Sequence, residues 1–143
     1  ILGAGPAAIG LTAALLLQGM FFSPSDLPQY GMNLTTLLVP LFALHAVAKR
    51  MIAPGVAYVD LAYRDVLALS VVYQGGVVAW VAFWAFYGAG FGAGNLAAIG
   101  TFSVAYMAVV LIEPLVDLGV LAAAKALRAN GSTLVTARLY NAA

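Results

Sequence analysis

Cysteine is absent from this 143-residue sequence, and charged residues make up only 8% of it. Without a thiol, the chain has no disulfide framework, no thiolate metal site and no cysteine nucleophile. Six basic and five acidic residues leave a formal net charge of +1, which excludes a basic surface for nucleic acid. Soluble domains contain about 25% charged residues, so this scarcity of charge also argues against a water-soluble fold.

Hydrophobic residues instead make up 64% of the chain, and the mean hydropathy is +1.03. A helix of about 20 apolar residues crosses the hydrocarbon core of a bilayer. We therefore predict an all-α integral membrane four-helix bundle over residues 1–129 and a polar C-terminal tail over residues 130–143. The four predicted spans cover residues 1–22, 32–50, 66–87 and 96–124.

The run at residues 32–50 is short and contains Pro40, so a re-entrant segment is an alternative to a kinked span. The basic residues help to decide, because Lys and Arg collect on the inner side of a membrane. They all lie before the third span or at the end of the chain: Lys49, Arg50, Arg64, Lys125, Arg128 and Arg138. Four spans put both regions on one face, so we predict the N and C termini on the same basic, inner side.

Five polar side chains should lie near the inner leaflet, given a helical rise of about 1.5 Å per residue. The simplest interpretation is an ion-pair cluster of Arg64, Asp65, Glu113 and Asp117, because charges inside a membrane are normally paired. Alternatively, Glu113 is proton-linked or holds a ligand, with His45 as its relay. His45 is also a candidate ligand of a tetrapyrrole such as haem or chlorophyll.

No catalytic triad, histidine pair or carboxylate set with metal-ligand spacing occurs, which favours a scaffold over an enzyme. A transporter should show internal repeats and a polar midplane path, and Gln74 and Thr101 are too few for one. Small residues along the spans suit close contacts between helices. They are Gly10, Ala14, Gly75, Ala79 and Gly100.

A short set of residues resembles the DoxX-like four-helix membrane proteins. These residues are Ser23-Pro24 after the first span, Gly31, the Arg64-Asp65 pair, and Pro114 with Asp117 in the last span. The resemblance implies a four-helix bundle near quinone or lipid chemistry, and it supplies no catalytic residues.

Together these features predict an accessory or structural subunit of a larger respiratory or photosynthetic membrane complex. It would contact lipid, pigment and other membrane subunits, in an organelle inner membrane, a thylakoid membrane or a bacterial inner membrane. The main alternative is a small membrane enzyme or binding protein that holds a quinone or isoprenoid beside Glu113 and His45. A proton or solute pathway is a third hypothesis.

Overall fold

The computed structural model describes residues 3–133, and every regular element in this part of the chain is helical. Four of the helices are long and apolar enough to cross a membrane. They are α1 (Ala4–Phe21), α2 (Tyr30–Met51), α3 (Tyr63–Ala89) and α4 (Ala93–Ala129). Two short 3-10 helices, η1 (Pro24–Gln29) and η2 (Tyr58–Asp60), lie in the connections. The prediction of four long apolar helices is confirmed, whereas residues 134–143 of the predicted tail lie outside the described residues.

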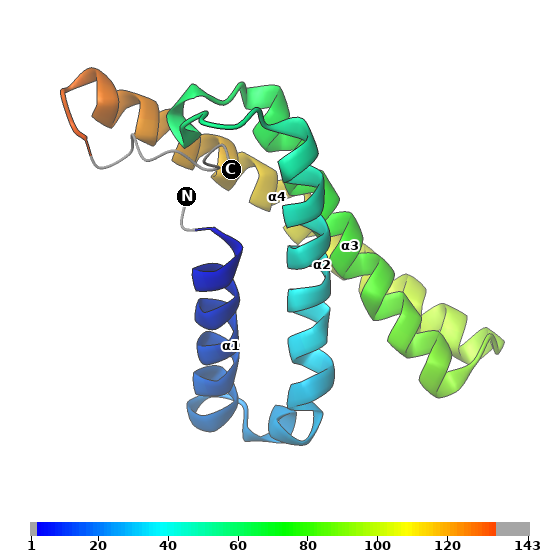
Figure 1. Ribbon diagram of the computed structural model, residues 1–143. Coiled ribbons are helices and arrows are strands. Elements are labelled where there is room, and N and C mark those ends of the chain that lie inside the picture. The colour runs from blue at the N-terminus through cyan, green and yellow to red at the C-terminus, as the bar shows by residue number, and fades with distance from the viewer. Residues whose placement is uncertain (1–2, 134–143) are drawn as a thin grey trace.

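The helices pack in the order of the chain, α1 on α2, α2 on α3 and α3 on α4. Figure 1 shows α1 and α2 side by side, joined through η1, while α3 and α4 form a longer pair that runs obliquely to them. Within residues 3–133, the backbone of α1 does not closely approach α3 or α4. The arrangement is therefore more open than a four-helix bundle in which α1 would also pack on α3 or α4.

A proline and a glycine set the crossing of α2 and α3. Pro40 is fully buried, and α2 continues through it without a break. A Cβ atom added to Gly76 would lie only 2.9 Å from Cβ of Pro40. Two tryptophans extend the same contact, since the indole N–H groups of Trp80 and Trp84 both donate to Oγ1 of Thr35, at 3.2 and 3.3 Å. The backbone of α3 can therefore approach α2 closely only because residue 76 has no side chain.

The three glycines predicted to mediate helix contacts make no such contact within residues 3–133. A Cβ atom added to Gly10, Gly75 or Gly100 would meet nothing within 4 Å. Neighbouring residues of a helix differ by about 100° around its axis, so only one of two adjacent glycines faces a given partner. Gly75 was predicted from the sequence to lie at a helix contact, whereas Gly76 lies at the contact in the structure.

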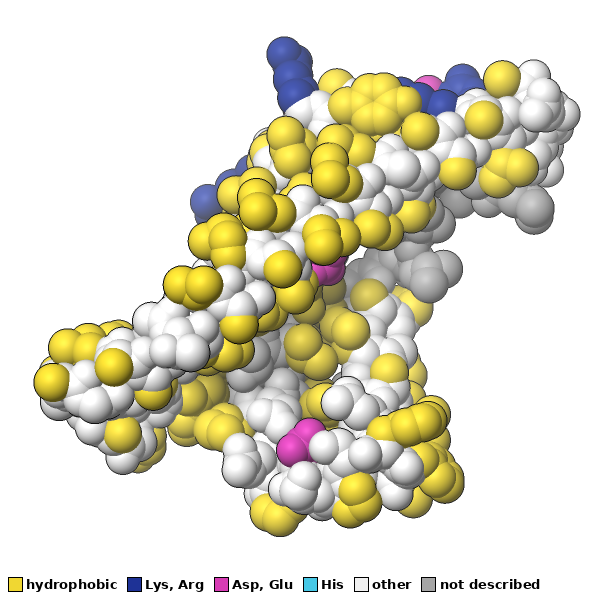
Figure 2. Space-filling view, turned by 180° about the vertical axis from the view of Figure 1, so that it is seen from behind, with side chains coloured by type: hydrophobic (Ala, Val, Ile, Leu, Met, Phe, Trp, Pro, Cys, Tyr) yellow, Lys and Arg dark blue, Asp and Glu magenta, His cyan; other side chains and the backbone are white. Residues whose placement is uncertain are grey.

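The buried core lies at one end of the molecule, where the connection between α2 and α3 packs against the end of α4. Its buried members are Ala48, Ile52, Leu61, Val66 and Leu121. Nζ of Lys125 donates to the carbonyl oxygen of Leu61 at 3.0 Å, and Arg128 forms an ion pair with Asp60. The two basic regions of the chain therefore meet at this end. Figure 2 shows Lys and Arg gathered there, while apolar side chains cover the helices.

Much of α4 presents large apolar side chains to the surroundings rather than to another helix. Leu111, Ile112, Leu115 and Val116 are all exposed. In each of the four long helices, most of the apolar stretch is not buried inside the chain. Such surfaces are stable in lipid, where an apolar side chain has no water to avoid.

Candidate functional site

A cavity of about 700 Å³ lies between the four long helices, next to the buried core. Most of its wall is apolar, and α1 contributes only small or apolar residues from its first turns. Its polar lining comes from four later elements. The polar residues are His45 of α2, Tyr58 of η2, Ser70 and Tyr73 of α3, and Glu113 and Asp117 of α4.

A partly buried hydrogen-bonded relay connects α3 to α4 beside this cavity. Gln74 is only 1% exposed, and it lies in the middle of α3. The hydroxyl of Tyr106 donates to Oε1 of Gln74 at 2.8 Å, and Nε2 of Gln74 donates to Oε2 of Glu113. In this arrangement the amide oxygen of Gln74 faces Tyr106 and its amide nitrogen faces Glu113. Gln74 thereby holds the carboxylate of Glu113, which also lines the cavity.

Ser70 lies one turn before Gln74 and lines the same cavity. Ser70 is 5% exposed, and its Oγ has no hydrogen-bond partner among the described residues. A buried hydroxyl without a partner destabilises a protein by about 1–3 kcal/mol. Such groups are rare, and each one requires an explanation.

Asp117 adds a second carboxylate to the cavity wall. It lies four residues after Glu113, so the two share one face of α4, as their spacing implies. Within residues 3–133, neither carboxylate forms a salt bridge. Burial raises the pKa of the Tyr58 phenol, and the nearby Asp117 side chain raises it further. The cavity wall therefore contains two carboxyl groups, and neither pairs with Lys or Arg among the described residues.

The four residues of the predicted ion-pair cluster lie in two separate places. Nε of Arg64 is 3.6 Å from Oδ1 of Asp65, and the Arg64 side chain is 89% exposed. Because α3 begins at Tyr63, Arg64 lies in its first turn, where the side chain extends away from the helices. Glu113 and Asp117 instead face the cavity with Gln74 and Tyr58 as neighbours.

His45 and Glu113, which the sequence analysis considered together, line the same cavity from α2 and α4. Among the described residues, no group of three His, Cys, Asp or Glu side chains converges in a way that could hold a metal ion. Sequence analysis did not select Ser70, Tyr73 or Tyr106. The spacing of four between Ser70 and Gln74, inside an otherwise apolar run, was a signal that could have identified one polar face of α3.

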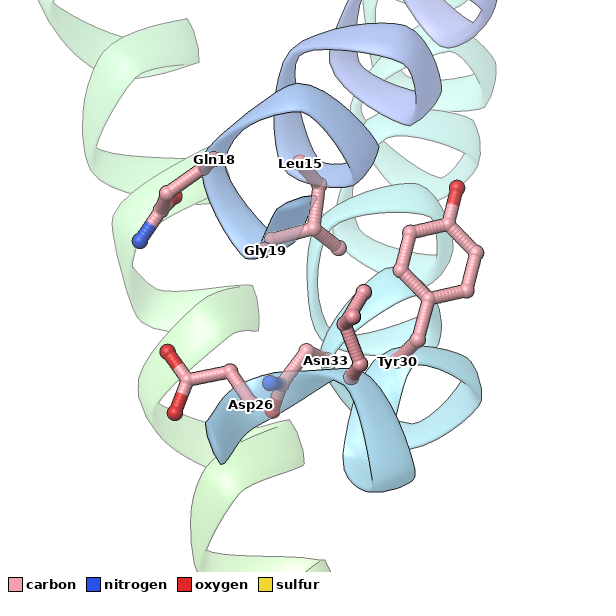
Figure 3. A pocket seen from close by; sticks show the side chains of 7 residues that line it. Leu15, Gln18, Gly19, Asp26, Tyr30 and Asn33 are labelled. Carbon is pink, nitrogen blue, oxygen red and sulfur yellow. The ribbon is translucent and has the colours of Figure 1, made fainter. Parts of the chain in front are cut away.

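A second, much smaller pocket lies where α1, η1 and α2 meet. Its volume is about 10 Å³, which is room for about one water molecule. Figure 3 shows Gln18 and Asp26 pointing to the same side, away from the ring of Tyr30. The Tyr30 hydroxyl donates a hydrogen bond to the carbonyl oxygen of Thr12 at 3.0 Å, and this bond links α2 to α1. This pocket is a packing feature of the helical hairpin.

Comparison with known proteins identifies the family. A family model, CbiM, described as the cobalt uptake substrate-specific transmembrane region, matches residues 1–130. No curated protein and no solved structure matched the chain.

This match overturns two predictions. The DoxX-like resemblance was wrong, because short pairs such as Ser23-Pro24 and Arg64-Asp65 are too brief to separate one family of apolar helices from another. The predicted subunit of a respiratory or photosynthetic complex was also wrong, because the matching family is a family of metal uptake. That prediction relied on the lack of a catalytic motif and of a continuous polar path, and neither lack identifies a scaffold. With 130 of its residues matched, the chain belongs to the CbiM family of transmembrane proteins.

Proposed function

We propose that this chain acts in a cytoplasmic membrane as the substrate-specific transmembrane component of an ECF-type cobalt uptake transporter. The family match over residues 1–130 is the observation that supports this function. The four apolar helices agree with it, since each is long enough to cross a bilayer. A component that selects the cargo works with other subunits that drive transport, so we expect partner proteins in the same membrane.

The basic end of the molecule is the proposed cytoplasmic end. It contains the connection between α2 and α3 and the end of α4, which are linked by Lys125 and by the Asp60–Arg128 pair. The other two connections contain no Lys or Arg. Basic residues are retained on the cytoplasmic side during insertion, so this distribution supports an orientation with α1–α2 and α3–α4 turns outside.

The charge of the cavity supports a cation as the cargo. Glu113 and Asp117 both line it, and neither is paired with Lys or Arg among the described residues. Charged walls with an apolar, low-dielectric surround raise the local concentration of the opposite charge. A divalent cation is therefore favoured in this cavity over an anion or a neutral solute.

Uptake of radioactive cobalt tests the proposed function directly. Cells that lack the gene should accumulate much less cobalt from a submicromolar solution than wild-type cells, and the intact gene on a plasmid should restore uptake. Leucine uptake in the same cells serves as the control for a general loss of membrane energy. Equal cobalt accumulation with and without the gene would refute the function.

A further inference from the structure

We propose that Glu113 directly contacts the divalent cation as it passes through the cavity, with the Ser70 hydroxyl as a second oxygen ligand and Gln74 as a positioning residue. The inference rests on the proposed function and extends it to individual atoms. It concerns the polar part of the cavity wall between α3 and α4.

Glu113 supplies the carboxyl group that such a contact requires. It lies within the long apolar helix α4, where an unpaired charge is expensive, and it accepts a hydrogen bond from the neutral amide of Gln74. Asp117 adds negative charge one turn away. A cation in the cavity would compensate both carboxylates, which no Lys or Arg side chain among residues 3–133 does.

Ser70 independently points to a ligand. Its hydroxyl is buried, lines the cavity and has no partner among the described residues, although serines in helices often donate to a backbone carbonyl one turn earlier. An incoming cation, or a water molecule bound to it, would supply the missing interaction. Because Ser70 and Gln74 are four residues apart, they lie on the same face of α3. That face also meets Glu113 through the Gln74 amide.

Gln74 acts on the cation only through Glu113. Tyr106 donates to Oε1 of Gln74, and the amide then presents Nε2 to the carboxylate. This relay restricts the rotation of the Glu113 side chain. Restricting a ligand in advance lowers the entropy that binding must overcome.

The proposed contact is weak, as transport requires. A site on a transport path must bind the ion well enough to admit it and loosely enough to release it. One carboxylate and one hydroxyl leave most of the coordination shell to water, which agrees with the absence of a three-residue metal cluster among the described residues. A cavity of about 700 Å³ has room for a hydrated ion, since six waters occupy about 180 Å³.

The experiment measures KM and maximal rate of cobalt uptake in cells that express the complete transporter. Glu113→Gln should raise KM by about tenfold or more, because it removes the ligand charge. Ser70→Ala should raise KM about two- to fivefold with little change in maximal rate. Ser103→Ala is the matched control, because Oγ of Ser103 already donates to the carbonyl oxygen of Ile99 and does not line the cavity.

The positioning role of Gln74 has its own readout. Gln74→Leu should raise KM in the wild-type background and have no further effect in the Glu113→Gln background, because it acts only through the carboxylate. If Gln74 had only a structural role, the double variant would transport less cobalt than Glu113→Gln alone, or less of it would be present in the membrane. Equal effects of Gln74→Leu in both backgrounds would refute the positioning role.

The outcomes separate this inference from the proposed function. If wild-type cells do not take up cobalt through this protein, the function itself fails. If they do, but Glu113→Gln and Ser70→Ala leave KM unchanged, the function stands and the contact is refuted. If an immunoblot shows that the Glu113→Gln variant is missing from the membrane, Glu113→Asp is measured in its place. A wild-type KM for both Glu113→Asp and Ser70→Ala then refutes the proposed contact.

Discussion

Replacing Gly76 with alanine tests the close crossing of α2 and α3. The added Cβ atom would lie 2.9 Å from Cβ of Pro40 and 3.4 Å from its Cα and Cγ atoms. Non-bonded carbon atoms prefer about 3.5–4.0 Å. The ring of Pro40 cannot rotate away, since it is closed onto the backbone, so the two helices must separate.

The expected loss follows from this overlap. Overpacking a close contact destabilises a protein by about 1–3 kcal/mol. Gly75→Ala is the matched control, because its Cβ atom would meet nothing within 4 Å. Alanine is favoured over glycine inside a helix by about 1 kcal/mol at either position. The control should therefore be neutral or stabilising, and Gly76→Ala should be less stable than Gly75→Ala by about 1–3 kcal/mol.

Tryptophan fluorescence is a suitable assay for this difference. The chain has two tryptophans, Trp80 and Trp84, and both donate to Thr35 across the same α2–α3 contact. Purified protein in mixed micelles is titrated with SDS, and the emission reports separation of the helices. Gly76→Ala should unfold at a lower SDS fraction than the wild type. Identical transitions for the two alanine variants would refute the tight Pro40–Gly76 contact.

Two further predictions use features of the same chain. Because cysteine is absent, Ser25→Cys and Ala53→Cys each create a single exposed thiol. A membrane-impermeant maleimide added to whole cells should label the Ser25→Cys variant and not the Ala53→Cys variant. Labelling of Ala53→Cys alone would reverse the proposed orientation. Thr35→Val keeps the side-chain shape but removes the acceptor of both indole N–H groups, so it should destabilise the protein by about 1–3 kcal/mol. Fluorescence-monitored SDS unfolding measures this change, and an unchanged midpoint would argue against the two hydrogen bonds.

The number and rough extent of the helices could be predicted because each depends on a run of apolar residues long enough to cross a bilayer. The starts of two helices were less accurate, since α3 begins at Tyr63 and α4 at Ala93, each three residues before its predicted span. The open arrangement could not be predicted. It depends on which faces meet, as the choice of Gly76 over Gly75 shows, and an almost uniformly apolar helix has little periodicity to reveal its buried face.

Only part of the candidate site could be predicted from the sequence, for a related reason. Glu113 and His45 were considered together, but the hydrogen bond between Gln74 and Glu113 joins two different helices and leaves no recognisable spacing in the sequence. A tight metal site needs several strong ligands, and these often leave a recognisable spacing in the sequence. A site that must release its ion needs fewer ligands and leaves more of the shell to water. In a transport protein, the scarcity of polar residues along a span is therefore weak evidence against a path, and the buried hydroxyl of Ser70 beside the Gln74–Glu113 pair is stronger evidence for one.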